Sequence, residues 1–154
     1  MNQEFILVTG GLGYIGSHTV VELVQEKDEN VLIVDNLDNS NIKCLDRLKE
    51  ITGKPDQIHF LELDIKNQDK MESEVFQKYT IKSVIHFAAL KAVGESVSKP
   101  LEYYNNNVCG TVTLLLLMKK YKVKCFIFSS SACVYGENPL CTEGDKIQPI
   151  NVYG

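Results

Sequence analysis

The sequence predicts an α/β fold, a doubly wound parallel sheet covered by helices on both faces. Short apolar runs alternate with amphipathic stretches along the chain, the pattern of strands separated by helices. The runs are apolar without interruption, as in Phe5-Ile6-Leu7-Val8. A strand with one wet face would alternate apolar and polar residues, so these strands are expected to be buried on both faces. Strands and helices that alternate in this way form parallel sheets with right-handed crossovers.

The first half of the chain contains two of these strands. The first strand is predicted at Phe5–Val8 and is followed by a helix from Ile15 to Lys27. Val31–Asp35 is the second strand. The polar cluster Asn39-Ser40-Asn41 is expected to cap a short helix that runs through Ile51, because Asn and Ser side chains accept hydrogen bonds from the first N–H groups of helices.

The second half of the chain continues the alternation. A third strand is predicted at Ile58–Leu63, and an amphipathic helix through Met71–Tyr79 follows it. Ser83–Phe87 is the fourth strand, and Cys125–Phe128 is the fifth. Between them a long helix is expected from about Pro100 to Lys120, with proline in the first turn, where its missing N–H is harmless. No repeat or linker interrupts the series, so residues 1–154 are interpreted as one domain.

Composition and charge exclude several classes of partner. The chain has 154 residues, of which 44% are hydrophobic and 23% charged, as in ordinary soluble domains. A net charge of −4 and a pI near 5.4 argue against nucleic-acid binding, which needs a clustered basic face. The longest apolar run is too short to cross a membrane, and the N-terminus has no secretory signal pattern. The five cysteines are odd in number and form no CxxC pair, which favours a reducing compartment and a cytoplasmic protein.

Three glycines follow the first strand and open the first helix. They are Gly10, Gly13 and Gly16. Bare backbone at such a turn lets a pyrophosphate approach the N–H groups and the positive end of the helix. Asp35 ends the second strand, where a carboxylate accepts hydrogen bonds from the adenosine ribose and repels a 2′-phosphate. This context indicates a Rossmann-type domain that binds NAD, or one descended from such a domain.

A second group of polar residues follows the fifth strand. Ser129-Ser130-Ser131 come directly after it, and Tyr153 comes later. By itself a serine cluster is typical of a polar loop. Over a dinucleotide site, the serines and the tyrosine would provide a hydroxyl pair for proton transfer to a sugar or alcohol oxygen. A tyrosine pKa near 10 is too high for a base at neutral pH, so this role needs positive charge nearby.

The end of the fourth strand holds two further candidates. Lys91 is either a solvated loop charge or a contact for phosphate, and we favour the phosphate contact. His86 is interpreted as a hydrogen-bonded structural residue and not as a catalyst. No metal site is predicted, because His18, His59 and His86 fall in different elements without ligand spacing.

Several segments of the chain together resemble the extended short-chain dehydrogenase/reductase family, and in particular its members that epimerise nucleotide sugars. The stretch from His86 to Ser96 is the most specific part of the resemblance, because the glycine motif is shared by many nucleotide-sugar enzymes. The matching segments are Val8–His18, Asp35-Asn36-Leu37 with Asn39-Ser40, Val84–Ser96, Pro100–Tyr104, Asn106-Asn107 and Ser129–Gly136.

The resemblance implies NAD-dependent interconversion of UDP-galactose and UDP-glucose by transient oxidation at C4 of the hexose, in a homodimer. It implies that Ser131 and Tyr153 are the catalytic hydroxyls. Lys91, Ser131, Ala132, Cys133 and Tyr153 would bind the sugar substrate. The implied NAD-binding residues are Gly10, Gly13, Tyr14, Ile15, Gly16, Asp35, Asn36, Leu37, Asn39, Ser40, Asp64, Ile65, Phe87, Ala88, Ala89, Lys91, Asn106, Ser129 and Tyr153.

The chain departs from the family pattern at two places. Cys133 stands where threonine is common, and we expect a packing change without nucleophilic chemistry. The family's Tyr-x-x-x-Lys lysine would fall at position 157, and the lobe that binds UDP would follow it. We therefore expect the chain to be the N-terminal piece of a longer protein and to lack epimerase activity by itself.

Two other functions remain open from the sequence. The first is a nucleotide-sugar 4,6-dehydratase or decarboxylase of the same family. Dehydratases carry an acid just after the catalytic serine or threonine, and Ala132-Cys133 occupy that place here. The second is a non-catalytic NAD-binding module.

Overall fold

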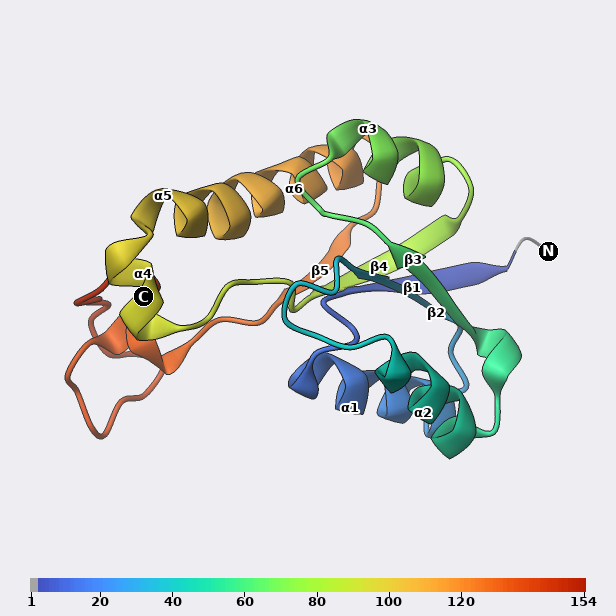
Figure 1. Cartoon of the computed structure of the whole chain (residues 1–154), viewed down its shortest axis with the longest axis horizontal. Helices are drawn as coiled ribbons and strands as arrows, with labels where there is room; N and C mark the ends of the chain where they lie inside the picture. The colour runs from blue at the N-terminus through green and yellow to red at the C-terminus, as the bar shows by residue number, and fades with distance from the viewer. Residues whose placement is uncertain (1–2) are drawn as a thin grey trace.

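The computed structural model describes residues 3–154, which fold around a five-stranded parallel sheet (Figure 1). The strand order is β3-β2-β1-β4-β5, so the chain starts at the centre, builds one side of the sheet and then crosses to the other. The predicted doubly wound parallel sheet is confirmed. The strands are β1 (Glu4–Thr9), β2 (Val31–Asp35), β3 (Ile58–Glu62), β4 (Thr80–His86) and β5 (Cys125–Phe128).

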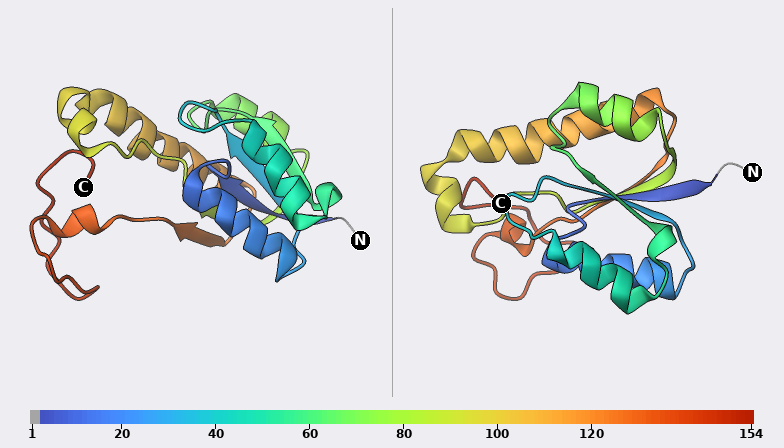
Figure 2. Two further views of the ribbon diagram at one scale, coloured as in Figure 1. Left: turned by 60° about the horizontal axis from the view of Figure 1, so that its bottom comes forward. Right: turned by 45° about the vertical axis from the view of Figure 1, so that its right-hand side comes forward.

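Helices cover both faces of this sheet (Figure 2). One layer contains α1 (Tyr14–Gln25) and α2 (Lys43–Thr52), and the other contains α3 (Gln68–Lys70), the π-helical turn η2 (Met71–Phe76) and α6 (Gly110–Lys120). In β1, Phe5 and Leu7 join the core under α6, whereas Ile6 and Val8 join the core over α1. The uninterrupted apolar runs are therefore explained by burial on two sides.

The fourth strand differs from its prediction at both ends. It begins at Thr80, three residues before the predicted start, because Thr80 and Ile81 pair with Glu4 and Phe5. The polar Lys82 interrupts the apolar run there, and the register shifts between Phe5 and Ile6. Phe87 lies just beyond the strand, but its N–H still donates to the Thr9 carbonyl at 2.9 Å.

The long helix is continuous over the predicted range, but it is not uniform. It consists of α5 (Pro100–Tyr103), the π-helical turn η3 (Tyr104–Cys109) and α6. The π-helical turn is not predicted by any pattern in the sequence. The same is true of the short α4 (Val93–Ser98) and of the 3₁₀ turns η1 (Pro55–Gln57) and η4 (Ala132–Tyr135).

The residues of the predicted helix-capping cluster before α2 have different hydrogen-bond partners. Asn41 accepts a hydrogen bond from the Lys43 N–H at 3.0 Å, as expected for a residue near a helix start. Ser40 does not cap the helix, since its hydroxyl donates to Asp35 at 2.8 Å. The cluster therefore starts α2 and also fixes the end of β2.

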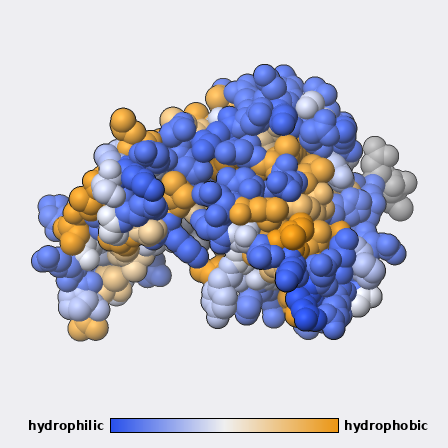
Figure 3. Space-filling view, viewed as in Figure 1, coloured by the Kyte–Doolittle hydropathy of each residue, from blue (hydrophilic) through white to orange (hydrophobic). Residues whose placement is uncertain are grey.

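The segment after β5 extends away from the sheet toward α4 and α5 (Figure 1). It folds back on itself, and the Gln148 N–H donates to the Val134 carbonyl at 2.8 Å. This end of the molecule carries scattered apolar side chains, whereas the surface over α3 is strongly hydrophilic (Figure 3). Among residues 3–154, no helix is both long and apolar enough to span a bilayer.

Candidate functional site

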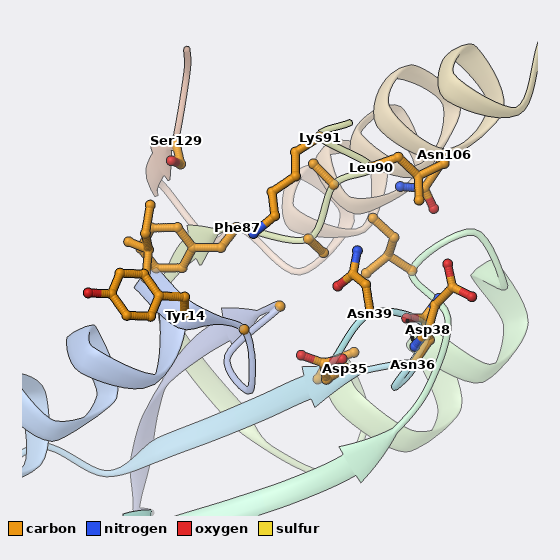
Figure 4. A pocket seen from close by; sticks show the side chains of 18 of the residues that line it. Tyr14, Asp35, Asn36, Asp38, Asn39, Phe87, Leu90, Lys91, Asn106 and Ser129 are labelled. Atoms are coloured by element: carbon orange, nitrogen blue, oxygen red, sulfur yellow. Dashed lines mark hydrogen bonds between the residues drawn. The ribbon is translucent and has the colours of Figure 1, made fainter. Parts of the chain in front are cut away.

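A pocket lies at the carboxyl ends of the central strands, where the chain order reverses between β1 and β4 (Figure 4). In doubly wound sheets this switch point is the usual place for ligands. Side chains from β2 and its loop face Tyr14, Phe87 and Ser129 across the pocket. The lining consists of Gly10, Gly13, Tyr14, Ile15, Gly16, Val34, Asp35, Asn36, Asp38, Asn39, Leu63, Ile65, Phe87, Ala88, Ala89, Leu90, Lys91, Asn106, Ser129, Ser130 and Tyr153.

The glycine loop between β1 and α1 is packed tightly against its surroundings. Gly10 has a φ of +70°, and a Cβ there would lie 2.6 Å from the backbone nitrogen of Ala88. A Cβ on Gly16 would collide with the Gly10 carbonyl. Gly13 is less crowded, because a Cβ there would lie 3.3 Å from its nearest neighbour, the Gly10 carbonyl oxygen. Two of the three glycines are thus required by close backbone packing that places the loop beside the pocket.

The first turn of α1 offers unpaired backbone donors to the pocket. The Ser17 N–H makes the first hydrogen bond of the helix, to the Gly13 carbonyl at 2.9 Å. The N–H groups before it have no partner within the helix, as at every helix start. The turn contains no acidic side chain, so its positive dipole end is not neutralised. This end of α1 is suited to an anion such as a pyrophosphate.

Asp35 connects the glycine loop to the loop after β2. One carboxylate oxygen accepts a hydrogen bond from the Leu12 N–H at 3.0 Å. The other accepts hydrogen bonds from the Leu37 N–H at 3.0 Å and the Ser40 hydroxyl at 2.8 Å. Asp35 is only 7% exposed. A carboxylate has about four acceptor positions. Three are filled here, so it has room for one hydrogen bond from a ligand hydroxyl.

His86 joins three elements behind the pocket. Its Nδ1 lies 2.6 Å from the Thr9 hydroxyl, and its Nε2 lies 2.9 Å from the Thr111 hydroxyl. The Thr111 hydroxyl donates to the Asn107 carbonyl at 2.6 Å, so it accepts from Nε2–H, and Nδ1 accepts from Thr9. Burial lowers the pKa of His86 to about 4, which keeps the ring neutral at pH 7. The predicted structural role is confirmed, and the neutral ring fixes α6 against β1 and β4.

The loop after β4 supplies one whole side of the pocket. Phe87, Ala88, Ala89, Leu90 and Lys91 all line it. The exposed Lys91 side chain extends into the cavity, and its ammonium points toward Phe87 (Figure 4). A cation in a pocket that also contains a helix N-terminus suits an anionic ligand.

The two predicted catalytic hydroxyls occupy different positions. Tyr153 is half-buried and lines the pocket, with its backbone N–H donating to the hydroxyl of the fully buried Ser96 at 3.3 Å. Ser131 is also half-buried but lies at the start of η4, where its hydroxyl accepts a hydrogen bond from the Cys133 N–H at 3.1 Å. Ser129 and Ser130 line the pocket in its place.

Most of the predicted cofactor-binding residues meet at this pocket. The sequence reasoning missed Val34, Asp38, Leu63, Leu90 and Ser130, although each lies next to a predicted residue along the chain. Their position beside strand ends, next to predicted residues, is the sequence feature that could have identified them as pocket residues. Six predicted residues do not line the pocket, and their roles stay predictions: Leu37, Ser40, Asp64, Ser131, Ala132 and Cys133.

Leu37, Ser40 and Asp64 make hydrogen bonds beside the pocket, Leu37 through its backbone N–H and the other two through their side chains. Leu37 and Ser40 hold Asp35, as described above. Asp64 accepts a hydrogen bond from the Lys66 N–H at 2.9 Å, which turns the chain beside Ile65. In the part of the chain that the structure describes, no three His, Cys, Asp or Glu side chains are grouped as metal ligands.

Comparison with known proteins identifies the family. A family described as GDP-mannose 4,6 dehydratase matches residues 7–154. The UDP-glucose 4-epimerase of Klebsiella pneumoniae is 54% identical over 134 residues, which cover 87% of this chain and 94% of that protein. The chain belongs to the GDP-mannose 4,6 dehydratase family, on the branch of the UDP-glucose 4-epimerases.

Longer members of this family are equally similar. The UDP-glucose 4-epimerase of Haemophilus influenzae is 58% identical over 152 residues, which cover 97% of this chain and 44% of that protein. The crystal structure of the UDP-glucose 4-epimerase from Bifidobacterium longum in complex with NAD⁺ and UDP superimposes with a TM-score of 0.91 at 47% identity. It is matched over 97% of this chain and 44% of its own. The chain thus spans less than half the length of these two relatives.

We expect His86 to make stability depend on pH below 6.5. In the unfolded chain His86 binds a proton near pH 6.5, whereas in the folded chain its ring stays neutral down to about pH 4. The stabilising contribution is complete above pH 6.5 and is lost as the pH falls toward 4, by about 3 kcal/mol in the free energy of unfolding.

Urea unfolding between pH 7 and pH 4 checks this expectation. Other groups also titrate in this range, so the informative quantity is the difference between the wild type and His86→Gln. The exposed His18 on α1 provides the matched control, His18→Gln. An equal loss of stability on acidification in the wild type and in His86→Gln would contradict the assignment.

Proposed function

We propose that the protein uses NAD to interconvert UDP-galactose and UDP-glucose through transient oxidation at C4 of the hexose. The observation that carries this proposal is the pocket at the switch point, in which the glycine loop, Asp35 and Tyr153 share one cavity. The similarity of the whole chain to an epimerase structure with NAD⁺ and UDP bound supports the same conclusion.

The residues of the pocket fit the dinucleotide. Gly10, Gly13 and Gly16 line the pocket, and the N–H groups of the first turn of α1 suit the pyrophosphate. Asp35 would accept one hydrogen bond from the adenosine ribose. Ile65, which is 4% exposed, contributes an apolar surface for the adenine ring. The remaining members of this proposed NAD site are Tyr14, Ile15, Asn36, Leu37, Asn39, Ser40, Asp64, Phe87, Ala88, Ala89, Lys91, Asn106, Ser129 and Tyr153.

Tyr153 and Ser131 are the proposed proton-handling groups. When bound, NAD supplies a reversible acceptor for the hydride from C4. The Tyr153 phenolate takes the proton of the 4-hydroxyl and returns it when the sugar is reduced again. Ser131 orients that hydroxyl through a hydrogen bond, and Ala132, Cys133 and Lys91 border the sugar. The phenolate form of this tyrosine needs a positive charge close to its oxygen.

The same residues argue against dehydration. Loss of the 6-hydroxyl of a sugar needs an acid that protonates the leaving oxygen. Ala132 and Cys133, directly after Ser131, provide no carboxylate. The Haemophilus influenzae relative at 58% identity is an epimerase, although the family as a whole is described by a dehydratase.

We also propose that two copies of the protein associate through the long helix, in the reducing environment of the cytoplasm. From Leu101 to Leu115, large apolar side chains remain exposed on this helix at intervals of three or four residues, which places them along one stripe that Leu116 widens. All five cysteines are free thiols, consistent with a reducing compartment. The stripe residues are Leu101, Tyr104, Val108, Val112, Leu115 and Leu116.

A charge in the middle of this stripe should separate the two copies. Val108 and Val112 are 50% and 49% exposed, and a glutamate at either position would have to be buried without a partner. We expect the wild type to have the mass of a dimer and Val108→Glu and Val112→Glu that of a monomer, as measured by light scattering after size exclusion. Val97→Glu on α4, where the valine is 67% exposed, is the control. A monomeric wild type would rule out this interface.

The buried charge of Asp35 should make the protein prefer NAD to NADP at least tenfold. A 2′-phosphate would meet a like charge, at a cost of about 1 kcal/mol or more. Titration of both dinucleotides by calorimetry measures the two dissociation constants. Equal affinities would show that Asp35 does not face the adenosine ribose.

Ser131→Ala should lower the epimerisation rate by about 10²-fold while NAD remains bound, because general acid–base partners contribute at this scale. The assay uses protein made from the complete gene and follows UDP-glucose formed from UDP-galactose. Ser73→Ala, on the distant η2, is the control. Wild-type protein that binds NAD but forms no UDP-glucose would refute the proposed activity, and full activity of Ser131→Ala would refute the role of that serine.

A further inference from the structure

The loop after β4 lines the pocket without secondary structure of its own. Beyond Phe87, which bonds to Thr9, the described backbone–backbone hydrogen bonds attach the chain again only at Ala92, whose carbonyl accepts from Ser96. Ala88, Ala89, Leu90 and Lys91 lie between these points, and all four line the pocket. Something other than the sheet must therefore hold this stretch in place.

The side chain of Asn107 holds it from the long helix. Its Oδ1 accepts a hydrogen bond from the Leu90 N–H at 2.8 Å, and its Nδ2 donates to the Leu90 carbonyl at 2.8 Å. The amide thus satisfies both backbone groups of one residue, as a neighbouring strand would. Two short bonds from a planar group fix the position and the rotation of the peptide units on either side of Leu90.

The π-helical turn η3 explains how two consecutive asparagines reach this region. Adjacent side chains diverge less in a wider turn than in an α-helix, and such turns often occur at functional sites. Asn106 is 9% exposed and lines the pocket, and its Nδ2 donates to the Oδ1 of Asn107 at 3.0 Å. Asn107 therefore also orients a side chain of the pocket.

The helix that carries Asn107 is itself anchored to the sheet. The carbonyl of Asn107 accepts a hydrogen bond from Thr111, which is bonded to His86 at the end of β4. We call the pair of hydrogen bonds between Asn107 and Leu90 the clamp. Both of its residues are therefore connected to β4. Asn107 does not line the pocket, so any effect it has on a ligand must pass through its neighbours.

We propose that Asn107 is a positioning residue for the dinucleotide site, which it shapes by fixing Leu90 and thereby the pocket-lining stretch Ala88–Lys91. This inference rests on the proposed function only in taking NAD as the ligand. It assigns a role to an asparagine that does not line the pocket.

The variant Asn107→Asp tests the clamp with minimal change of shape. Aspartate keeps the acceptor for the Leu90 N–H but sets a second oxygen against the Leu90 carbonyl, which leaves that carbonyl without its donor. We expect the dissociation constant for NAD to rise at least about tenfold, as measured by calorimetry. The amide proton of Leu90 should exchange faster in NMR, with unchanged exchange at Val84 and Ile85 in β4. Asn105→Asp makes the same charge change at an exposed position of the same turn and should leave both quantities at their wild-type values.

Each outcome distinguishes the two proposals. Wild-type protein that fails to bind NAD would overturn the proposed function. Wild-type protein that binds NAD, with Asn107→Asp as tight as Asn105→Asp, would overturn the positioning role alone. Faster exchange at Val84 and Ile85 would indicate general unfolding, and Asn107→Ser, which is neutral and smaller, then replaces the aspartate variant. Wild-type NAD affinity in folded Asn107→Ser would also overturn the proposal, and a tenfold loss would support it.

Discussion

The pocket depends on one buried carboxylate. Asp35 ends β2, and its oxygens hold the glycine loop through Leu12 and the following loop through Leu37 and Ser40. Two loops that belong to different strands are thereby joined at a point where both backbones would otherwise leave N–H groups unpaired. The charge that we propose to meet the ligand also holds the two loops of its site. A residue with both tasks tolerates little change, because a neutral replacement would alter recognition and loop geometry together.

Close backbone packing is the second constraint. Gly10 lies against Ala88 so closely that no side chain fits between them, and this contact joins the loops after β1 and β4. Behind it, neutral His86 joins Thr9 to Thr111 and so ties the long helix to the same two strands. The loops of the pocket are therefore mounted on a rigid frame of parallel strands, which is how α/β folds present binding residues.

The two sides of the proposed chemistry differ in how firmly they are held. The dinucleotide side rests on Asp35, the glycine loop and the clamp at Leu90. Tyr153 is held on the other side by a hydrogen bond from its backbone N–H to Ser96, and within residues 3–154 Ser131 accepts hydrogen bonds only from the nearby Cys133 and Val134 N–H groups. The hydroxyl pair is therefore held by fewer hydrogen bonds than the dinucleotide side.

The sequence by itself determined the parallel sheet, the glycine turn and the carboxylate at the end of β2, because apolar runs, glycine spacing and strand ends are local patterns. It also indicated that His86 is structural. Only the tertiary structure decided which neighbours of the predicted residues face the pocket, among them Asp38, Leu90 and Ser130. It also showed that Gly10 is needed for a close backbone contact with Ala88, and that Asn107 reaches Leu90 from a π-helical turn. These features arise from contacts between segments far apart along the chain, which no local periodicity encodes.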